Sequence, residues 1–421
     1  MTAPKGGPGP TSGSEGLVGA FRSAWAELLP VGRDAATGGY HRLAWTEADL
    51  ACRAWFRAQA AVRGMAVVPD RGGNLWAWWG EPGPDAVVTG SHLDSVPGGG
   101  TYDGPLGVIA GFLAVDLLCD RAARPVRPVA VVAFSDEEGA RFGVACLGSR
   151  LITGGIDRRT ALALVDDGGV TLADAMRAAG ADPDVIGRDG EALARIGVFV
   201  ELHIEQGRTL ADLGAAVGVA TGIWPHGRWR FRFDGAANHA GTTRLPDRRD
   251  PMPACAATVL AARAAAEHSA ALCTVGKVRV EPGGVNAVPS RVDCWLDARA
   301  PDTAALDAAV ARVRDAAHDA AAEHRVTVEV REESYSPPVE FEPALRDRLV
   351  DALGARDIQT PVLPTGAGHD AGVLSGHVPA AMLFVRNPTG VSHAPDEHAG
   401  LDDCLAGVEA LAAALEELAC R

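Results

Sequence analysis

The sequence predicts an α/β protein in which one discontinuous domain is interrupted by a smaller ferredoxin-like α+β domain. In the first and last parts of the chain, short apolar runs typical of buried strands alternate with helical stretches. The stretch from about 222 to 330 instead follows the order strand, helix, strand, strand, helix, strand, which is typical of a ferredoxin-like domain. We therefore expect a tail over 1–15, a main domain over 16–221 and 331–421, and an inserted domain over 222–330.

The main domain is expected to open with helices and to continue with a sheet. Apolar residues recur at helical spacing between about 16 and 63, broken by a Gly-rich loop, which predicts two helices. Strand candidates follow at 73–79, 86–92, 129–135 and 196–204, with a helix at about 106–120. Polar residues end three of these runs, at His92, Ser135 and His203. Ligand sites form at such an edge of an α/β sheet, so we expect the site there.

The inserted domain shows a different pattern of apolar residues. Alternation at 228–235 predicts a half-buried strand, and further strands are expected at 274–280 and 291–300. An Ala-rich helix is predicted at 252–268 and a second helix at 302–324. From about 339 the chain returns to helix and strand, with a buried strand at 380–385, and rejoins the main domain.

Composition excludes several classes of protein. The chain has 421 residues, 47 % hydrophobic and 22 % charged, so it is neither disordered nor fibrous. Its 39 basic and 54 acidic residues give a net charge of −15, which disfavours nucleic-acid and anionic-membrane partners. The 8 cysteines form no CxxC pair, so we expect reduced thiols. The N-terminus lacks the pattern of a signal peptide and no window matches a membrane span, so we expect a cytoplasmic protein.

Two acidic and histidine-containing segments could bind metal. His92 follows a predicted strand, and Asp103 follows a Gly-rich loop that lets the chain fold back toward it, so both could bind one divalent ion. Asp94 could orient the imidazole. Glu137 and Glu138 are adjacent after another apolar strand. A polar loop and a solvated turn are the alternative interpretations of these two segments.

The combination of these segments with two further histidines favours a metal site. His203 and His393 also follow apolar, strand-like runs, so each would reach the same edge of the sheet. Two histidines on one metal, a histidine and a glutamate on another, and an aspartate between them would support two-metal hydrolase chemistry. The remaining glutamate of the Glu137–Glu138 pair would then be free to act as a base.

A series of motifs shows a resemblance to a known family. In order they are GSHLDSVPGGGTYDGPLGV, FSDEEGARFG, ELHIEQG, NHAGTT, GVNAVPS, LDARAPD, PTGAGHDA and GVSHAPDEH. This series resembles the amidase, hydantoinase and carbamoylase branch of the M20 metallopeptidase family, which includes N-carbamoyl-L-amino-acid hydrolases, β-ureidopropionase and allantoate amidohydrolase. The resemblance implies a mixed-sheet dinuclear-metal hydrolase domain whose inserted ferredoxin-like domain serves as a lid and dimerisation domain.

The resemblance also implies roles for individual residues. His92 and His203 would bind one metal, Glu138 and His393 the other, and Asp103 would bridge them. Glu137 would be the general base. Zinc or manganese would suit these ligands, and cobalt or nickel would also fit. Peptidase and aminoacylase members tend to carry a carboxylate at the position of His203, so the resemblance favours ureido over peptide substrates.

The substrate residues implied by the resemblance are Gln206, Arg228, Asn286 and Arg299. A guanidinium binds a carboxylate in a bidentate fork, so Arg299 suits a carboxylate-bearing substrate, although a surface ion pair is the alternative interpretation of this arginine. His239 resembles a lid histidine that reaches the site of the other subunit and polarises the scissile carbonyl. A homodimer is therefore implied.

The activity expected from this resemblance is hydrolysis of a ureido or carbamoyl C–N bond on a small carboxylate substrate, with release of ammonia and carbon dioxide. Allantoate is favoured because Arg228 and Asn286 suit a ureido-rich substrate. An N-carbamoyl-L-amino-acid hydrolase, an N-formyl or N-acyl amino acid deacylase, a dipeptidase, and a metal-binding protein without activity are the alternatives. The run Arg386, Asn387 and Pro388 lies before the last metal histidine and could line the pocket.

Overall fold

The computed structural model describes residues 14–421 and divides into two compact units. Unit 1 comprises the chain up to Thr221 and from Glu340 to Arg421, and unit 2 comprises Gly222–Val339. Helix α1 (Ser14–Leu28) begins within the tail expected over 1–15, the rest of which lies outside the described residues.

The second boundary of the insertion lies nine residues later than the sequence suggests, at 339 rather than 330. Strand β12 (Thr327–Ser336) continues past 330 and pairs with β7 (His226–Asp234) along its length, from Thr327 opposite Asp234 to Ser336 opposite His226. Ending the insertion at 330 would cut this strand in half.

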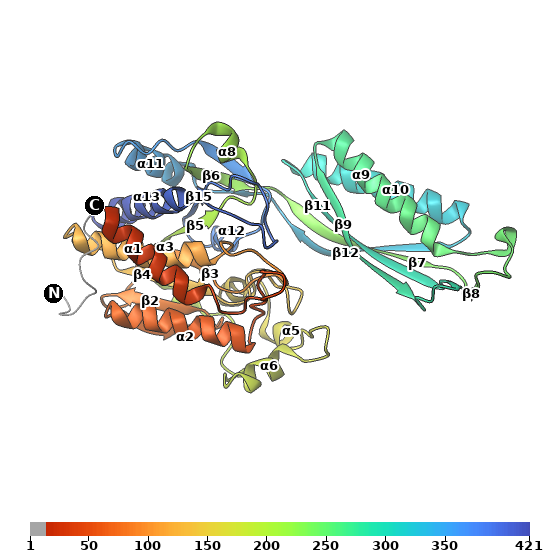
Figure 1. The fold of residues 1–421 in the computed structure, drawn as a ribbon, viewed down its shortest axis with the longest axis horizontal. Coiled ribbons are helices and arrows are strands. Elements are labelled where there is room, and N and C mark those ends of the chain that lie inside the picture. Colours follow the sequence, from red (N-terminus) through yellow and green to blue (C-terminus); the bar gives the residue numbers. More distant parts are fainter. Residues whose placement is uncertain (1–13) are drawn as a thin grey trace. The chain divides into compact units, whose positions relative to one another are not determined.

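Unit 1 is built around a mixed nine-stranded sheet (Figure 1). The strand order is β1 (Ala66–Pro69), β2 (Leu75–Trp79), β4 (Val129–Phe134), β3 (Ala86–His92), β5 (Ile196–Ile204), β15 (Ala380–Val385), β6 (Val217–Ile223) and β13 (Val339–Glu340), with β14 (Val362–Thr365) pairing with β6. The central strands β4, β3, β5 and β15 are parallel, whereas β2 and β6 run antiparallel to their neighbours β4 and β15. The predicted α/β class with a mixed sheet is confirmed.

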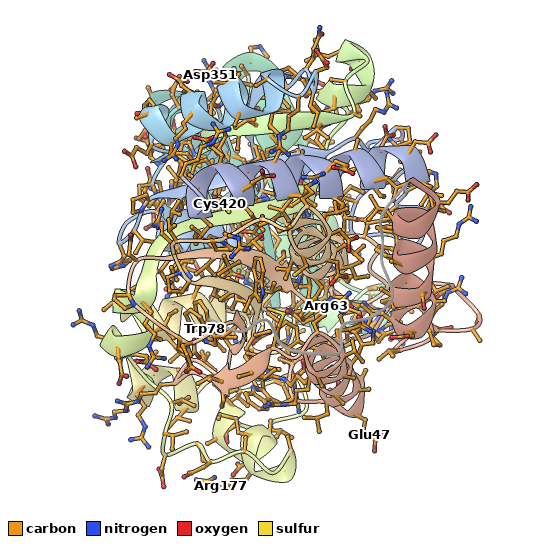
Figure 2. The ribbon with its side chains drawn as sticks, turned by 90° about the vertical axis from the view of Figure 1, so that its left-hand side faces the viewer. Glu47, Arg63, Trp78, Arg177, Asp351 and Cys420 are labelled. Carbon is orange, nitrogen blue, oxygen red and sulfur yellow. The ribbon has the colours of Figure 1, made fainter. Side chains whose placement is uncertain are left out.

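Helices cover both faces of this sheet, which explains why the central strands read as continuous apolar runs. One face packs against α1, α2 (Glu47–Val62), α3 (Pro105–Asp120), α11 (Pro343–Gly354) and α13 (Leu401–Ala419). Figure 2 shows α13, which ends just before Cys420, beside α11, the helix that carries Asp351. On the other face, α12 (Asp370–Leu374) lies against β5 and β15 and contacts α4 (Leu147–Thr153).

A segment between β4 and β5 forms a small helical region of its own. It contains α4, α5 (Arg158–Leu162), α6 (Leu172–Ala178) and α7 (Gly190–Arg195), and α8 (Thr209–Leu213) follows β5. Leu147, Leu172 and Met176 belong to a separate apolar cluster beneath these helices. Within residues 14–421, none of the helices is both long and apolar enough to cross a bilayer.

Unit 2 has the predicted ferredoxin-like topology. Its sheet has the order β12, β7, β11 (Arg291–Arg299), β9 (Leu272–Glu281), and every pair is antiparallel. Helices α9 (Pro251–Ser269) and α10 (Thr303–Glu323) cover the face to which Trp229, Phe231 and Phe233 of β7 point. The short strands β8 (Asn238–His239) and β10 (Ala287–Val288) pair with each other, and η1 (Leu245–Asp247) precedes α9.

Candidate active site

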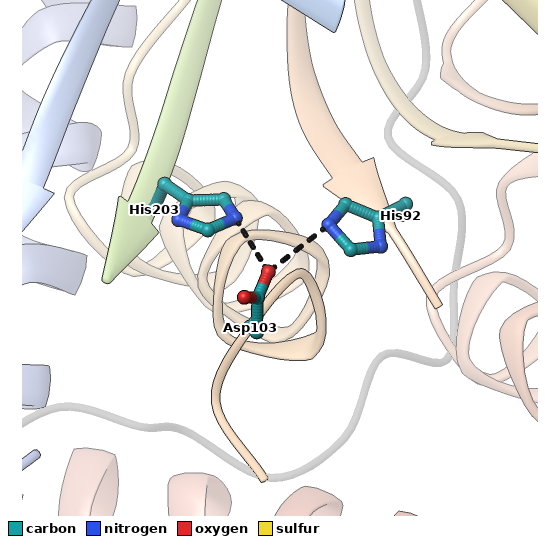
Figure 3. A group of neighbouring side chains, drawn as sticks. All are labelled: His92, Asp103 and His203. Carbon is teal, nitrogen blue, oxygen red and sulfur yellow. Dashed lines mark ion pairs between the residues drawn. The ribbon is translucent and has the colours of Figure 1, made fainter. Parts of the chain in front are cut away.

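Two histidines reach one edge of the unit 1 sheet on neighbouring strands. His92 is the last residue of β3 and His203 lies one residue before the end of β5, and these strands are parallel neighbours. Parallel strands end at the same edge, so both imidazoles meet there, with ring centroids 5.8 Å apart. Figure 3 shows both rings directed at Asp103, which lies at the turn before α3.

The hydrogen bonds of these histidines fix which ring nitrogen faces Asp103. Nδ1 of His92 lies 3.2 Å from the carbonyl oxygen of Asp94, and Nδ1 of His203 lies 2.8 Å from its neighbour's carbonyl oxygen. A carbonyl oxygen only accepts, so Nδ1 carries the proton and Nε2 presents its lone pair. The two Nε2 atoms lie 3.4 Å and 3.1 Å from Oδ1 of Asp103. Both are buried and, within the described residues, make no hydrogen bond, which fits a divalent cation.

A second group of ligands uses the other oxygen of Asp103. Nε2 of His393 lies 3.3 Å from Oδ2 of Asp103 and 3.5 Å from Oε2 of Glu138. Each of the two groups offers three ligand atoms within 4.8 Å of one another. Asp103 thus contributes one oxygen to each group, which is the arrangement of a bridging carboxylate. The structure brings the five predicted ligands together.

Glu137 lies beside the first group. Its Oε2 is 3.7 Å from Nε2 of His92, and the side chain of Cys146 donates to its Oε1 at 3.3 Å. The carboxylate of Asp94 accepts the backbone N–H groups of Glu137 and Glu138 at 3.1 Å and 3.0 Å and so fixes the turn after β4. Asp94 therefore holds His92 by its carbonyl oxygen and the glutamate pair by its carboxylate.

Acidic side chains gather at this buried site, and their mutual repulsion and burial shift the pKa values of the site residues. Burial, together with the neighbouring carboxylates of Asp370 and Glu138, raises the pKa of Glu137 well above its usual value. Burial and the neighbouring charge of Asp103 raise the pKa of Glu138 to about 7. The hydrogen bond to Asp103 raises the pKa of His393 to about 9. Buried carboxylates gathered in this way are stabilised by a cation, so the charge of the site agrees with its geometry.

Other contacts complete the site. Nε2 of Gln206 donates to Oδ2 of Asp103 at 2.7 Å and lies 3.2 Å from Nε2 of His393, so this predicted substrate residue adjoins the second group. Glu397 is a further residue of the site that is not predicted from the sequence, and its Oε1 accepts from the backbone N–H groups of Tyr102 and Asp103 at 2.8 Å and 3.0 Å. The only available signal was an acidic residue inside the last motif.

The loop before His393 makes contacts within the fold. Arg386 forms a two-pronged ion pair with Asp403 of α13, at 2.6 Å and 2.9 Å. The side chain of Asn387 accepts from the backbone of Thr389 and Gly390 and holds the turn. Both side chains are therefore engaged in the structure of unit 1.

The remaining predicted residues lie in unit 2, at separate places. Arg228 of β7 and Arg299 of β11 both contact Asp297 on the face of the sheet away from the helices. His239 and Asn286 are exposed and adjacent, since β8 pairs with β10 and the carbonyl oxygen of Asn286 accepts from Ala240. Arg228 is the third residue of β7, and the six residues that follow it span roughly 20 Å at about 3.3 Å per residue. This stretch separates the arginines at its start from His239 beyond its end.

Comparisons with known proteins show the family of this chain. The model of peptidase family M20/M25/M40 matches residues 88–417. The chain belongs to this family. Among the relatives of this M20 protein, an N-carbamoyl-L-amino acid amidohydrolase of Geobacillus stearothermophilus is 36 % identical, covering 92 % of this chain and 96 % of that protein. Allantoate amidohydrolase of Escherichia coli is 32 % identical, covering 96 % and 99 %.

A solved structure is similar over the whole fold. The amidase of the hydantoinase/carbamoylase family from Burkholderia vietnamiensis has a TM-score of 0.88 at 30 % identity and covers 96 % of this chain and 98 % of that one. The predicted membership of the amidase branch is confirmed. This M20 protein is a hydrolase of C–N bonds other than peptide bonds, and hydrolases of this family depend on metal.

Proposed function

We propose that this M20 amidohydrolase removes a ureido or carbamoyl group from a small carboxylate, releasing ammonia and carbon dioxide, with allantoate as the first candidate substrate. The observation that carries the proposal is the pair of buried imidazoles whose free Nε2 atoms face one carboxylate, next to a buried glutamate. An N-carbamoyl-L-amino acid is the second candidate, favoured by the 36 % identity to a relative of that name.

Two divalent cations per subunit, zinc or manganese, are part of this proposal. His92, His203 and Asp103 would hold one, and Asp103, Glu138 and His393 would hold the other. Bound there, such cations act as Lewis acids that polarise the scissile carbonyl. Cobalt or nickel would be held by the same nitrogen and oxygen donors.

Glu137 would move the proton in this reaction. Its carboxylate accepts a proton from water, and the oxygen of that water forms a bond to the ureido carbonyl carbon. The C–N bond of the substrate then breaks, and the proton held by Glu137 passes to the departing nitrogen. The carbamate released decomposes to ammonia and carbon dioxide, so each turnover consumes water and yields one ammonia.

Binding of the substrate would involve Arg228 and Arg299 at its carboxylate, with Gln206 and Asn286 at its polar groups. His239 would stabilise the developing oxyanion. A substrate of this size cannot span the roughly 20 Å of strand that lies between Arg228 and the end of β7, beyond which His239 of the same unit 2 lies. This separation supports a homodimer in which His239 of one subunit serves the other subunit's site. A cytoplasmic location also belongs to the proposal.

The experiment that tests the proposed activity uses protein stripped of metal and reloaded with zinc or manganese. Ammonia, formate and free amine are measured after incubation with allantoate, several N-carbamoyl-L-amino acids, an N-formyl amino acid and an N-acetyl dipeptide. Ammonia from a ureido or carbamoyl substrate supports the proposal, and the preferred substrate decides between the two candidates. Formate or amine without ammonia would replace it with a deacylase or a dipeptidase.

The shared site has a separate test. Arg299→Ala and His239→Ala would each have low activity alone. Mixed subunits carrying one variant each would regain part of it, because one of the two sites then contains both native residues. No recovery in mixed dimers that form normally would contradict the shared site.

A further inference from the structure

The outer face of the unit 2 sheet carries a carboxylate between two arginines. Oδ1 of Asp297 accepts from Nε of Arg299 at 2.8 Å, and Oδ2 accepts from another guanidinium nitrogen of Arg299 at 3.2 Å. Nε of Arg228 lies 3.4 Å from Oδ2. Asp297 therefore contacts both of the arginines that we propose bind the substrate carboxylate.

The strands impose this arrangement. Residues two apart on a strand point to the same face, which places Asp297 beside Arg299 on β11. Arg228 is directly opposite Asp297 in the register of β7 and β11, and such opposite pairs have side chains in contact. The cluster of these three side chains, Arg228, Asp297 and Arg299, is thus fixed by backbone pairing rather than by flexible loops.

The charge of this cluster is that of a single cation. Burial alone would raise the pKa of Asp297, but the hydrogen bond and charge of Arg299 lower the pKa below its usual value, so the carboxylate is ionised at neutral pH. Two guanidiniums and one carboxylate leave one positive charge. One carboxylate of a ligand neutralises that charge, and a second carboxylate would face Asp297.

Further along the same face, Arg230 and Arg232 each have an acidic partner. Asp293 lies 3.1 Å from Arg232, and Glu333 lies 3.7 Å from Arg230. Asp293 is on the same strand as Asp297 and points to the same face, four residues away. It therefore provides a matched control for the effect of removing one negative charge from this surface.

We propose that Asp297 is a specificity-determining residue that limits this amidohydrolase to substrates with one carboxylate. The inference rests on the proposed function, because it takes Arg228 and Arg299 as the carboxylate anchor. Asp297 holds the guanidinium of Arg299 in place and repels a second negative charge on the ligand. Substrates with two carboxylates are disfavoured by that repulsion and not by their size.

The test compares Asp297→Asn with wild type and with Asp293→Asn. Butyrate and succinate are four-carbon acids that differ in the number of carboxylates, and both are used as competitive inhibitors of the best substrate. Asparagine keeps the side-chain oxygen that accepts from Arg299 but removes the charge. We expect the ratio of the succinate to the butyrate inhibition constant to fall about three-fold in Asp297→Asn and to stay constant in Asp293→Asn.

Each outcome bears on one proposal. An unchanged ratio in an active, folded Asp297→Asn protein overturns the role of Asp297, and so does an equal fall in Asp293→Asn. If Asp297→Asn does not fold, Asp297→Thr, which suits a strand, replaces it. If the wild type hydrolyses no ureido or carbamoyl substrate, the proposed function fails instead. In that case calorimetry measures the dissociation constants of succinate and butyrate for the three proteins, and the ratio of these two constants decides the role of Asp297.

Discussion

Gly104 determines where His92 can lie, and its replacement by alanine tests the metal site directly. Gly104 has φ +85° and ψ −59° at the start of α3, directly after Asp103. A Cβ atom at this position would lie 2.5 Å from Cε1 and Nδ1 of the His92 ring. Ordinary contact between carbon atoms is about 3.5–4.0 Å, so the ring would have to move by about 1 Å.

The size of this movement sets the expected effect. Metal–ligand distances vary by only about 0.2 Å in working sites, so a ring moved by about 1 Å no longer provides a well-placed Nε2. Disturbing the support of a ligand costs about 10- to 100-fold in metal affinity, and we expect Gly104→Ala to lose at least this much. The unfavourable backbone conformation costs a further 1–3 kcal/mol or so in the free energy of unfolding.

Gly98→Ala separates the two effects. Gly98 also has a positive φ, +72°, but a Cβ there would meet no atom within 4 Å. The assay measures the dissociation constants for zinc and manganese by competition with a chelator, together with thermal unfolding of the metal-free proteins. Both variants should be less stable, but only Gly104→Ala should bind metal weakly. Equal metal affinity of the two variants would refute the role assigned to His92.

Three further predictions follow from other contacts. Glu137→Gln should lower kcat by about 10²- to 10⁴-fold while metal affinity stays within a few-fold of wild type, and retained turnover in a steady-state assay would exclude Glu137 as the base. Metal binding displaces protons from Glu138 and His393, whose pKa values are about 7 and 9, so metal affinity should rise between pH 6 and pH 9. A chelator competition that gives the same affinity at both pH values would contradict this assignment. Asp116→Ala should lower the free energy of unfolding by about 3–5 kcal/mol. The reason is that the guanidinium of Arg63, whose side chain is only 8 % exposed, loses the carboxylate that lies 2.7 Å from it. A loss below about 1 kcal/mol in denaturant titrations would contradict this prediction.

The strands that the sequence predicted well are those buried on both faces. Strands such as β3, β4 and β15 are buried at every position, and this gives an unbroken apolar run that is visible without the structure. The second half of β12 is exposed from Arg331 to Tyr335, so its sequence does not alternate between apolar and polar residues and does not indicate a strand. The sequence pattern therefore predicts an end of the insertion that is too early. The short helices α4 to α7 are not predicted from the sequence, because α4 has only 7 residues and α5, α6 and α7 bury at most three residues each.

The grouping of the candidate metal ligands was predictable because each ligand follows a strand or a glycine-rich loop that delivers it to one edge of the sheet. Contacts that depend on long-range packing were not predictable. Glu397 supports the loop at Asp103 from 294 residues away along the chain. Asp297 lies two residues from Arg299 in the sequence, but only the pairing of β7 with β11 shows that it also contacts Arg228. The pattern of the sequence identifies single residues, whereas the fold identifies their partners.

The position of β15 has a consequence for how the chain is made. This strand, Ala380–Val385, lies between β5 and β6, although both of those strands end before residue 224. A ribosome therefore finishes unit 2 before it makes the strand that joins the two parts of the larger sheet. Until then β5 and β6 each keep an unpaired edge, which is a template for association with other chains. Synthesis of β15 and of the residues that follow it is thus the step that joins the two parts of the sheet and delivers His393. A nascent chain released before this step would be prone to aggregate and could not assemble the second ligand group.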